Sequence, residues 1–182
     1  MPNDMSPKRH RTFDLFGALL GDCRAWGSFE DRAGHVKRTF EATTRGAFST
    51  DTQFILEEVF AFDDGTRERR TWVFDRIQTD RWEGRCDDCV GTADLRVGAH
   101  AAVMAYTFRL KLSNRTIDLK FRDRFYAIGD DGLMSRANVT KFGLKVGEVT
   151  VFFTPLTSEA GRSSEIEFVD DERADRTFEA VE

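Results

Sequence analysis

The chain contains few of the residues that covalent staples and kinked backbones need. It has three Cys and three Pro in 182 residues. Three Cys cannot all pair with one another, and reduced thiols are typical of a reducing compartment. A chain of this length buries roughly 70% of the surface that its unfolded form exposes. We therefore expect a single domain that is held together by an apolar core rather than by disulfides.

Long hydrophobic runs are also missing. Residues 1–12 are polar and basic, and the apolar stretch that follows, FDLFGALL (13–20), is short and contains Asp14. This stretch is too short for the hydrophobic part of a secretory signal, and no segment is long enough for a transmembrane helix. Asp22 takes the place of the small residue that precedes a lipid-modified cysteine, which leaves Cys23 as an ordinary thiol. The sequence thus predicts a soluble, cytoplasmic protein.

An excess of positive charge is absent as well. The formal net charge is −5, so we expect no nucleic-acid partner. Of the 27 basic side chains, 21 are Arg and six are Lys. The planar guanidinium binds carboxylates and phosphates in two places, which makes Arg the better residue for paired or partly buried positions.

The sequence is rich in Phe, with 17 of them, and in short alternating segments separated by turn residues. Aromatic residues favour strands, and many short strands without intervening helices indicate a β-sandwich or barrel. Phe13, Phe16, Leu19 and Leu20 have helical spacing and predict a short N-terminal helix that plugs or caps the fold. The predicted fold is all-β, an antiparallel up-and-down barrel of about eight to ten strands. The expected strands are residues 36–46, 53–62, 69–77, 80–86, 99–112, 116–128, 133–141 and 146–154.

The pattern divides the chain into three segments. Residues 1–12 form a flexible N-terminus, and residues 13–156 form the single barrel domain. Residues 157–182 lose the alternation and hold nine acidic residues and three Arg. Such a composition predicts a mostly disordered acidic tail, in which EIEFV (165–169) is a candidate for a brief extra strand.

Charged and polar residues fall on the apolar faces of several expected strands. Because side chains alternate along a strand, each strand can be divided into two faces. On the faces with large apolar residues lie Arg38, Glu58, Arg70, Tyr106 and Asp123. An isolated buried charge is very costly, so these groups must pair with one another, with water or with a ligand. A closed network of ion pairs fits this pattern, and so does a pocket in which a spare Arg binds the carboxylate of a fatty acid or another amphiphile.

Three short motifs contain residues that could react or bind a ligand. Cys86-Asp87-Asp88-Cys89 has redox spacing, but two neighbouring acids raise the pKa of a thiol, and a structural role is favoured. Asp63-Asp64-Gly65 predicts a hairpin turn. Glu58 among Phe residues would have a raised pKa and could act as a general acid or base, although pairing with an Arg is the favoured interpretation. We expect no metal, since the three His are scattered, and no cofactor.

Five blocks of the sequence resemble the bacterial domain-of-unknown-function 3833 family. The blocks are WGSFEDRAGHVKRTF (26–40), LEEVFAFDDGTRERRTW (56–72), WEGRCDDCVGTA (82–93), FRDRFYAI (121–128) and SRANVTKFGLKVGEVTVFF (135–153). Positions that match the family pattern are Gly27, Arg32, Glu58, Asp64, Gly65, Arg70, Trp72, Gly84, Asp88, Gly91, Tyr106, Asp123, Arg136, Lys141, Phe142 and Gly143. Cys89, Arg124-Phe125 and Ser135 depart from it, and Cys89 argues against a family function for the cysteine pair.

The resemblance implies a lipocalin-like barrel of unassigned activity, and an association of relatives with fatty-acid-modifying enzymes favours a lipid ligand. We expect the barrel to bind a small amphiphile, fatty-acid-like, with the following candidate residues: Arg38, Phe60, Arg70, Trp72, Tyr106, Asp123 and Arg136. One alternative is an enzyme that acts on a hydrophobic small molecule, with Glu58 as general acid or base. Another is a partner subunit of a lipid-modifying enzyme, or a protein in peripheral contact with a membrane, that docks through residues 13–20 or the acidic tail.

Overall fold

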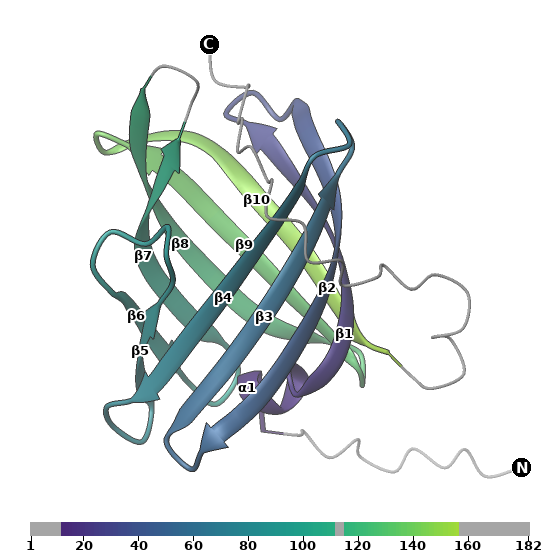
Figure 1. The fold of residues 1–182 in the computed structure, drawn as a ribbon, viewed down its shortest axis with the longest axis vertical. Coiled ribbons are helices and arrows are strands. Elements are labelled where there is room, and N and C mark those ends of the chain that lie inside the picture. The colour runs from purple at the N-terminus through teal and green to yellow at the C-terminus, as the bar shows by residue number, and fades with distance from the viewer. Residues whose placement is uncertain (1–11, 112–114, 157–182) are drawn as a thin grey trace, which may run out of the picture.

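The computed structural model describes residues 12–111 and 115–156, and these form a closed antiparallel β-barrel. Each strand pairs with its neighbours in the sequence, and β1 closes the barrel onto β10 (Figure 1). A single turn of helix, α1 (Leu15–Ala18), precedes the strands. The strands are β1 (Gly21–Asp31), β2 (Val36–Thr50), β3 (Gln53–Phe62), β4 (Arg67–Arg76), β5 (Arg81–Arg85), β6 (Ala93–Val97), β7 (Ala102–Lys111), β8 (Thr116–Ile128), β9 (Gly132–Lys141) and β10 (Leu144–Pro155).

The architecture confirms the predicted all-β, lipocalin-like barrel with a short N-terminal helix. Two strands, β1 and β6, are additional to the eight that were expected. The inward positions at the start of β1 hold the small residues Cys23 and Ala25, so its alternation is hard to see, and β6 has only five residues between two turns. Residues 1–11 of the N-terminus that was predicted to be flexible, the predicted acidic tail with residues 165–169, and residues 112–114 lie outside the described residues.

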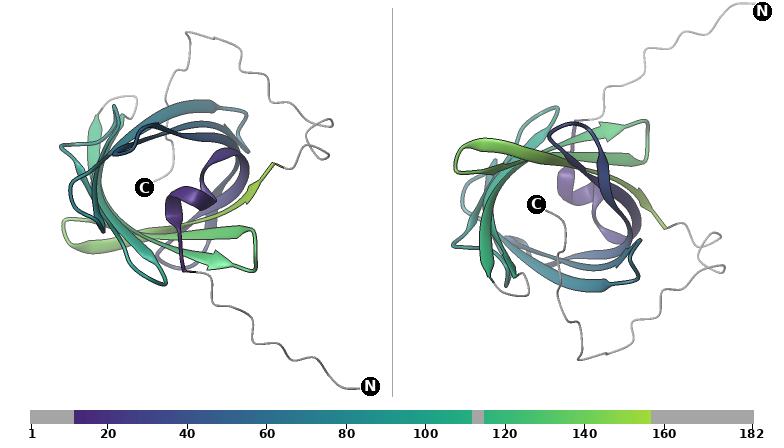
Figure 2. Two further views of the ribbon diagram at one scale, coloured as in Figure 1. Left: turned by 90° about the horizontal axis from the view of Figure 1, so that it is seen from below. Right: turned by 90° about the horizontal axis from the view of Figure 1, so that it is seen from above.

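Alternation along each strand sorts the side chains between the inside and the outside of the barrel. On β3 the buried positions are Phe54, Leu56, Glu58 and Phe60, as the sequence predicted. On β8 the buried positions include Leu119, Asp123 and Phe125, on the face that was expected. A slip of one residue would reverse the two faces of a strand, so this agreement confirms the predicted inward faces of β3 and β8. Figure 2 looks along the barrel that these inward side chains fill.

Helix α1 closes one end of the barrel (Figures 1 and 2). Asp14 caps it, since its carboxylate accepts a hydrogen bond of 3.0 Å from the backbone N–H of Gly17. The Phe16 ring lies 4.3 Å from the ring of Trp82 and 4.8 Å from that of Phe54, between centroids. Gly46 on β2 permits this approach, because a Cβ atom there would lie 2.0 Å from the carbonyl oxygen of Leu19. The apolar cluster of residues 13–20 is thus a plug, as one reading of its spacing predicted.

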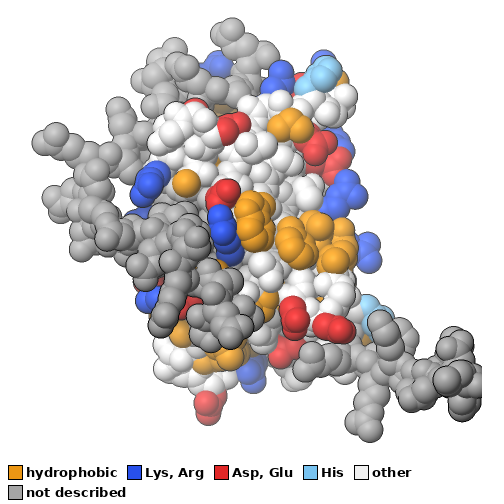
Figure 3. Space-filling view, turned by 90° about the vertical axis from the view of Figure 1, so that its right-hand side faces the viewer, with side chains coloured by type: hydrophobic (Ala, Val, Ile, Leu, Met, Phe, Trp, Pro, Cys, Tyr) orange, Lys and Arg blue, Asp and Glu red, His pale blue; other side chains and the backbone are white. Residues whose placement is uncertain are grey.

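The outer wall carries ion pairs between neighbouring strands. Arg24 and Glu41 are 2.7 Å apart, and Arg109 and Asp118 are 2.7 Å apart. Figure 3 shows, on one face, a band of apolar side chains between charged side chains of both signs. Exposed pairs of this kind each contribute little to stability, so the inner wall provides most of the energy of the fold. Within the part of the chain that the structure describes, no helix has the length and apolar character to cross a membrane.

Candidate functional site

The barrel encloses a cavity of about 190 Å³. Phe16 of α1 and Phe74 of β4 line it at the closed end, whereas Phe62 and Arg38 line it towards the opposite end. Most of its lining is apolar, and it includes Phe60, Trp72, Met104, Phe121 and Phe125. The charged groups among the lining residues are Arg38, Glu58, Glu68, Arg70 and Asp123. An apolar cavity with a few convergent polar groups is the usual form of a small-molecule site.

Arg38 forms part of the cavity rim beside the β3–β4 turn. Its guanidinium donates a hydrogen bond of 2.8 Å to Asp64 and contacts the hydroxyl of Thr66. The same group lies 3.6 Å from the centroid of the Phe62 ring, in a cation–π contact. Gly65 has a φ of 83°, which confirms the hairpin turn predicted at Asp63-Asp64-Gly65. These contacts fix the start of β2 to the β3–β4 turn at the rim.

Glu58 and Arg70 face each other across β3 and β4 in the middle of the cavity. Burial raises the pKa of Glu58 above its ordinary value, and the charge of Arg70 and a hydrogen bond from Trp72 oppose this shift. Arg70 also lies 3.7 Å from the carboxylate of Glu68 and 4.5 Å from the centroid of the Phe108 ring. The charge attraction between Glu58 and Arg70 and the hydrogen bond from Trp72 favour a role for Glu58 in orienting Arg70.

Tyr106 and Asp123 form a second polar pair on β7 and β8. The hydroxyl of Tyr106 donates a hydrogen bond of 3.4 Å to Oδ2 of Asp123. The Tyr106 ring stacks on Phe121 at 5.2 Å and meets Trp72 edge-on at 5.3 Å, so its position is fixed. Burial raises the pKa of Asp123 to about 7, and the hydrogen bond from Tyr106 opposes this shift. The carboxyl group therefore carries a proton for part of the time at neutral pH.

Two buried polar atoms of this cluster have no hydrogen-bond partner among the described residues. They are Nε of Arg70 and Oδ1 of Asp123. A polar atom that is removed from water without a partner costs about 1–3 kcal/mol. Both residues line the cavity, so a polar group of a bound molecule could satisfy one or both of these atoms.

The free energy of unfolding is expected to decrease between about pH 4 and pH 7 because of Asp123. An Asp in an unfolded chain ionises near about pH 3.9, whereas the pKa of Asp123 in the fold is about 7. Between these values the folded state keeps a proton that the unfolded state has released. At about 1.4 kcal/mol per pKa unit, stability falls by up to about 4 kcal/mol across the window and is level above it. Urea unfolding of wild type and Asp123→Asn across this range measures the effect.

The difference in stability between Asp123→Asn and wild type should grow in favour of the variant as the pH rises. Asp118→Asn is the matched control on the same strand, because Asp118 is exposed and its pKa is lowered by Arg109. Its difference from wild type should stay constant above about pH 5. A pH-independent difference for Asp123→Asn would contradict the raised pKa.

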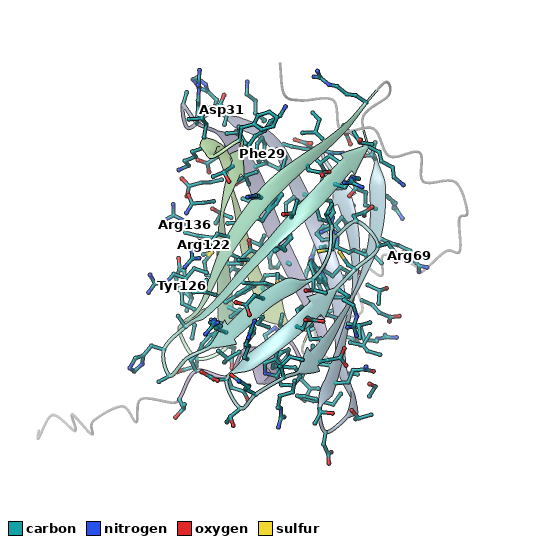
Figure 4. All side chains as sticks on the ribbon, turned by 90° about the vertical axis from the view of Figure 1, so that its left-hand side faces the viewer. Phe29, Asp31, Arg69, Arg122, Tyr126 and Arg136 are labelled. Atoms are coloured by element: carbon teal, nitrogen blue, oxygen red, sulfur yellow. The ribbon has the colours of Figure 1, made fainter. Side chains whose placement is uncertain are left out.

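The structure brings together six of the seven candidate ligand-binding residues. Arg38, Phe60, Arg70, Trp72, Tyr106 and Asp123 all line the cavity. Arg136 does not, because it points outward from β9 and its guanidinium lies 2.9 Å from the carboxylate of Glu148 (Figure 4). Arg122 and Tyr126 also lie on this outer surface. The register of β9 directs Ala137 inward and its neighbour Arg136 outward.

Sequence reasoning missed Glu68. This residue lines the cavity beside Arg70, and the alternation 68–70–72–74 on β4 could have revealed it.

The expectation that the two neighbouring acids raise the pKa of both thiols is wrong for Cys86. A hydrogen bond from Cys89 lowers the pKa of Cys86, burial opposes this, and the charge of Arg70 adds to the lowering. Only the fold could reveal that Arg70 lies near this turn.

Comparison with known proteins gives a family and a fold. The family described as "Protein of unknown function (DUF3833)" matches residues 2–155. The structure is similar to an S-type phycobiliprotein lyase, CPES, from Guillardia theta, with a TM-score of 0.60 and 9% identity over 79% of this chain and 92% of that one. It is also similar to a protein with unknown function from the DUF3598 family of Nostoc punctiforme, with a TM-score of 0.55 and 13% identity over 80% of this chain and 51% of that one. No curated protein sequence matches the chain.

Proposed function

The chain belongs to the DUF3833 family of proteins of unknown function, and from that premise we propose that it binds a small amphiphilic molecule, such as a fatty acid, inside the barrel. One observation carries the proposal. In a cavity whose lining is mostly apolar, two buried polar atoms, Nε of Arg70 and Oδ1 of Asp123, lack a hydrogen-bond partner among the described residues. A ligand carboxylate accepts a hydrogen bond from Nε of Arg70 and, when Asp123 is protonated at Oδ1, a second one from that oxygen. The alkyl chain of the ligand suits the aromatic lining.

A ligand carboxylate would bind between β4 and β8. One oxygen accepts a hydrogen bond from Nε of Arg70, and the other accepts from the carboxyl group of Asp123 when that group is protonated. Because the pKa of Asp123 is about 7, this donor is present at neutral pH and below. Glu58, on the neighbouring strand β3, orients the guanidinium through charge attraction. The alkyl chain lies against Phe60, Trp72 and their neighbours.

The size of the cavity limits the length of the enclosed chain. A cavity of about 150 Å³ admits benzene, and this cavity measures about 190 Å³. By proportion, a chain of about six to eight carbons fills it. Longer chains must extend beyond the enclosed space or displace side chains, so each further carbon should add little affinity.

Isothermal titration calorimetry with straight-chain acids from butanoate to dodecanoate tests the proposal. Each enclosed methylene contributes about 0.8 kcal/mol, about a fourfold gain in affinity. The gain should continue to a chain of about six to eight carbons and then level off. The matching alcohols are the control, and they should bind more weakly because they cannot pair with Arg70 as a carboxylate does. Equal binding of acids and alcohols, or none by any chain length, would overturn the proposal.

The contacts also bear on the two alternative functions. Of the apolar residues in 13–20, Phe13, Leu15, Phe16 and Leu19 are buried in the plug and Leu20 is exposed, which leaves little docking surface for a lipid-modifying enzyme or a membrane. Docking through the acidic tail concerns residues outside those described. For an enzyme with Glu58 as general acid or base, the pairing of Glu58 with Arg70 and Trp72 provides a different role for the residue. Ligand binding is therefore the function that the geometry supports best.

A further inference from the structure

The turn from Cys86 to Cys89 is a fixed part of the barrel wall. It follows β5 and lies against β7, as the loop beside β5 and β6 in Figure 1. The N–H of Cys89 donates a hydrogen bond of 3.1 Å to the carbonyl oxygen of Cys86. Cys89 also forms a β-bridge with Phe108, and the N–H of Val90 donates to the carbonyl of Thr107 at 2.9 Å. The backbone therefore holds the two cysteines in one position relative to each other.

This backbone geometry suits a disulfide bond. The ends of a hydrogen-bonded four-residue turn lie within about 7 Å between Cα atoms, and disulfides span about 4.4–6.8 Å. The two thiols lie close enough for each to shift the pKa of the other, and both pack against the main apolar core. Both thiols are free and half-buried. Among the described residues, no third His, Cys, Asp or Glu completes a metal site with them, so the pair is better suited to oxidation than to metal binding.

Arg70 connects this turn to the cavity, because its guanidinium lies 4.5 Å from the centroid of the Phe108 ring and Cys89 forms a β-bridge with Phe108. Its charge favours the thiolate at both cysteines, and the Cys86 thiol, in turn, acts on Arg70. Hydrogen bonding from Cys89 is the main cause of the lowered pKa of Cys86, so Cys86 is the thiol that attacks. The Cys86 thiolate then competes with any other anion for the same guanidinium.

We propose that Cys86 and Cys89 form a reversible disulfide that controls the affinity of the cavity for carboxylates. The step is exchange with a low-molecular-weight disulfide such as oxidised glutathione. Cys86 loses its proton, and its thiolate attacks one sulfur of the disulfide and releases one glutathione thiolate. Cys89 then loses its proton, and its thiolate attacks the Cys86 sulfur and releases the second glutathione thiolate; each released thiolate takes up a proton. The protein loses two electrons and two protons, and the disulfide reagent is reduced to two thiols.

The effect on binding rests on the proposed function. In the reduced protein, the negative charge that Cys86 gains when it loses its proton lies near Arg70 and weakens the attraction between Arg70 and the ligand carboxylate. The disulfide is neutral and leaves the guanidinium to the ligand carboxylate, so the oxidised protein should bind a carboxylate more tightly.

The first experiment equilibrates the full chain with mixtures of reduced and oxidised glutathione, traps free thiols with N-ethylmaleimide and maps them by mass spectrometry. We expect Cys86 and Cys89 to lose their adducts together, as one intramolecular disulfide. Cys23 is the internal control, because it is fully buried and hydrogen-bonds the carbonyl of Ala18. The single variants Cys86→Ser and Cys89→Ser should instead accumulate a mixed disulfide with glutathione. A wild type that carries only mixed disulfides, or none, would overturn the proposal.

The second experiment titrates hexanoate into the reduced and the oxidised protein. Affinity should be several-fold higher in the oxidised form, and the Cys86→Ser/Cys89→Ser double variant should not respond to oxidation. A disulfide with equal hexanoate affinity in both states would overturn the control of binding. A disulfide in a protein that binds no carboxylate in either state would overturn the proposed function instead, so the two failures are distinguishable.

Discussion

The Arg70→Met protein is expected to bind hexanoate about 10- to 100-fold more weakly than wild type. A hydrogen bond to a charged group contributes about 1.5–3 kcal/mol, and the substitution removes the only guanidinium of the central cluster of Glu58, Arg70, Tyr106 and Asp123. Met fills a similar volume without charge. The affinity for hexanol should change little, because the alcohol does not depend on the guanidinium. Calorimetric titrations of both ligands separate the loss of the ion pair from a general disturbance of the cavity.

Removal of Arg70 also leaves Glu58 and Glu68 without their shared cation, and a buried charge without a partner destabilises a fold. The double variant Arg70→Met/Glu58→Gln reduces this strain and should show the same loss of hexanoate affinity. Arg69→Met is the matched control, because Arg69 is the next residue on β4 and points away from the barrel (Figure 4). Wild-type hexanoate affinity in the Arg70→Met protein would remove Arg70 from the site.

Phe16→Ala is expected to destabilise the protein by about 3–5 kcal/mol, as is typical of Phe to Ala substitutions in a core. The Phe16 ring is buried and contacts Trp82, Phe54 and Phe74, with centroids 4.3, 4.8 and 5.9 Å apart. Because Phe16 forms the floor of the cavity, its loss should also shift the chain-length limit towards longer acids. Urea unfolding measures the first effect, and the acid series measures the second.

Phe142→Ala makes the same chemical change at an exposed position. The side chain of Phe142 is 94% exposed on the β9–β10 turn, where it contributes almost no buried surface. Its free energy of unfolding should remain within about 0.5 kcal/mol of wild type. If Phe16→Ala and Phe142→Ala were equally stable, α1 would not be seated in the barrel as the structure shows.

Much of the inner wall follows from the sequence alone. Alternation has a period of two in any strand, so the segments around Glu58, Arg70 and Asp123 revealed their apolar faces without knowledge of their partners. The high cost of an isolated buried charge then predicted that these groups meet. Arg136 was a candidate through the family resemblance rather than through alternation, and β9 carries it on the outer side of the barrel.

Other features depend on contacts between segments that are distant in the sequence. Strand β1 pairs with both β2 and β10, and these pairings close the barrel. Its inward residues are small and leave space for α1 and for large neighbouring side chains, so the local sequence pattern does not reveal the strand. The lowered pKa of Cys86 likewise depends on contacts in the fold, first a hydrogen bond from Cys89 and then the charge of Arg70 on another strand, whereas the two adjacent acids in the sequence suggested the opposite.

The sequence by itself determined the all-β class, the short helix and the inward side chains of most strands, because these depend on local periodicity and turn residues. The tertiary structure alone decided which charges share the cavity, how much space remains between them, and that Nε of Arg70 and Oδ1 of Asp123 lack a partner among the described residues. The reason is physical. Electrostatic interaction weakens with distance in space, and closure of the barrel brings together residues as far apart in the sequence as Cys23 and Pro155.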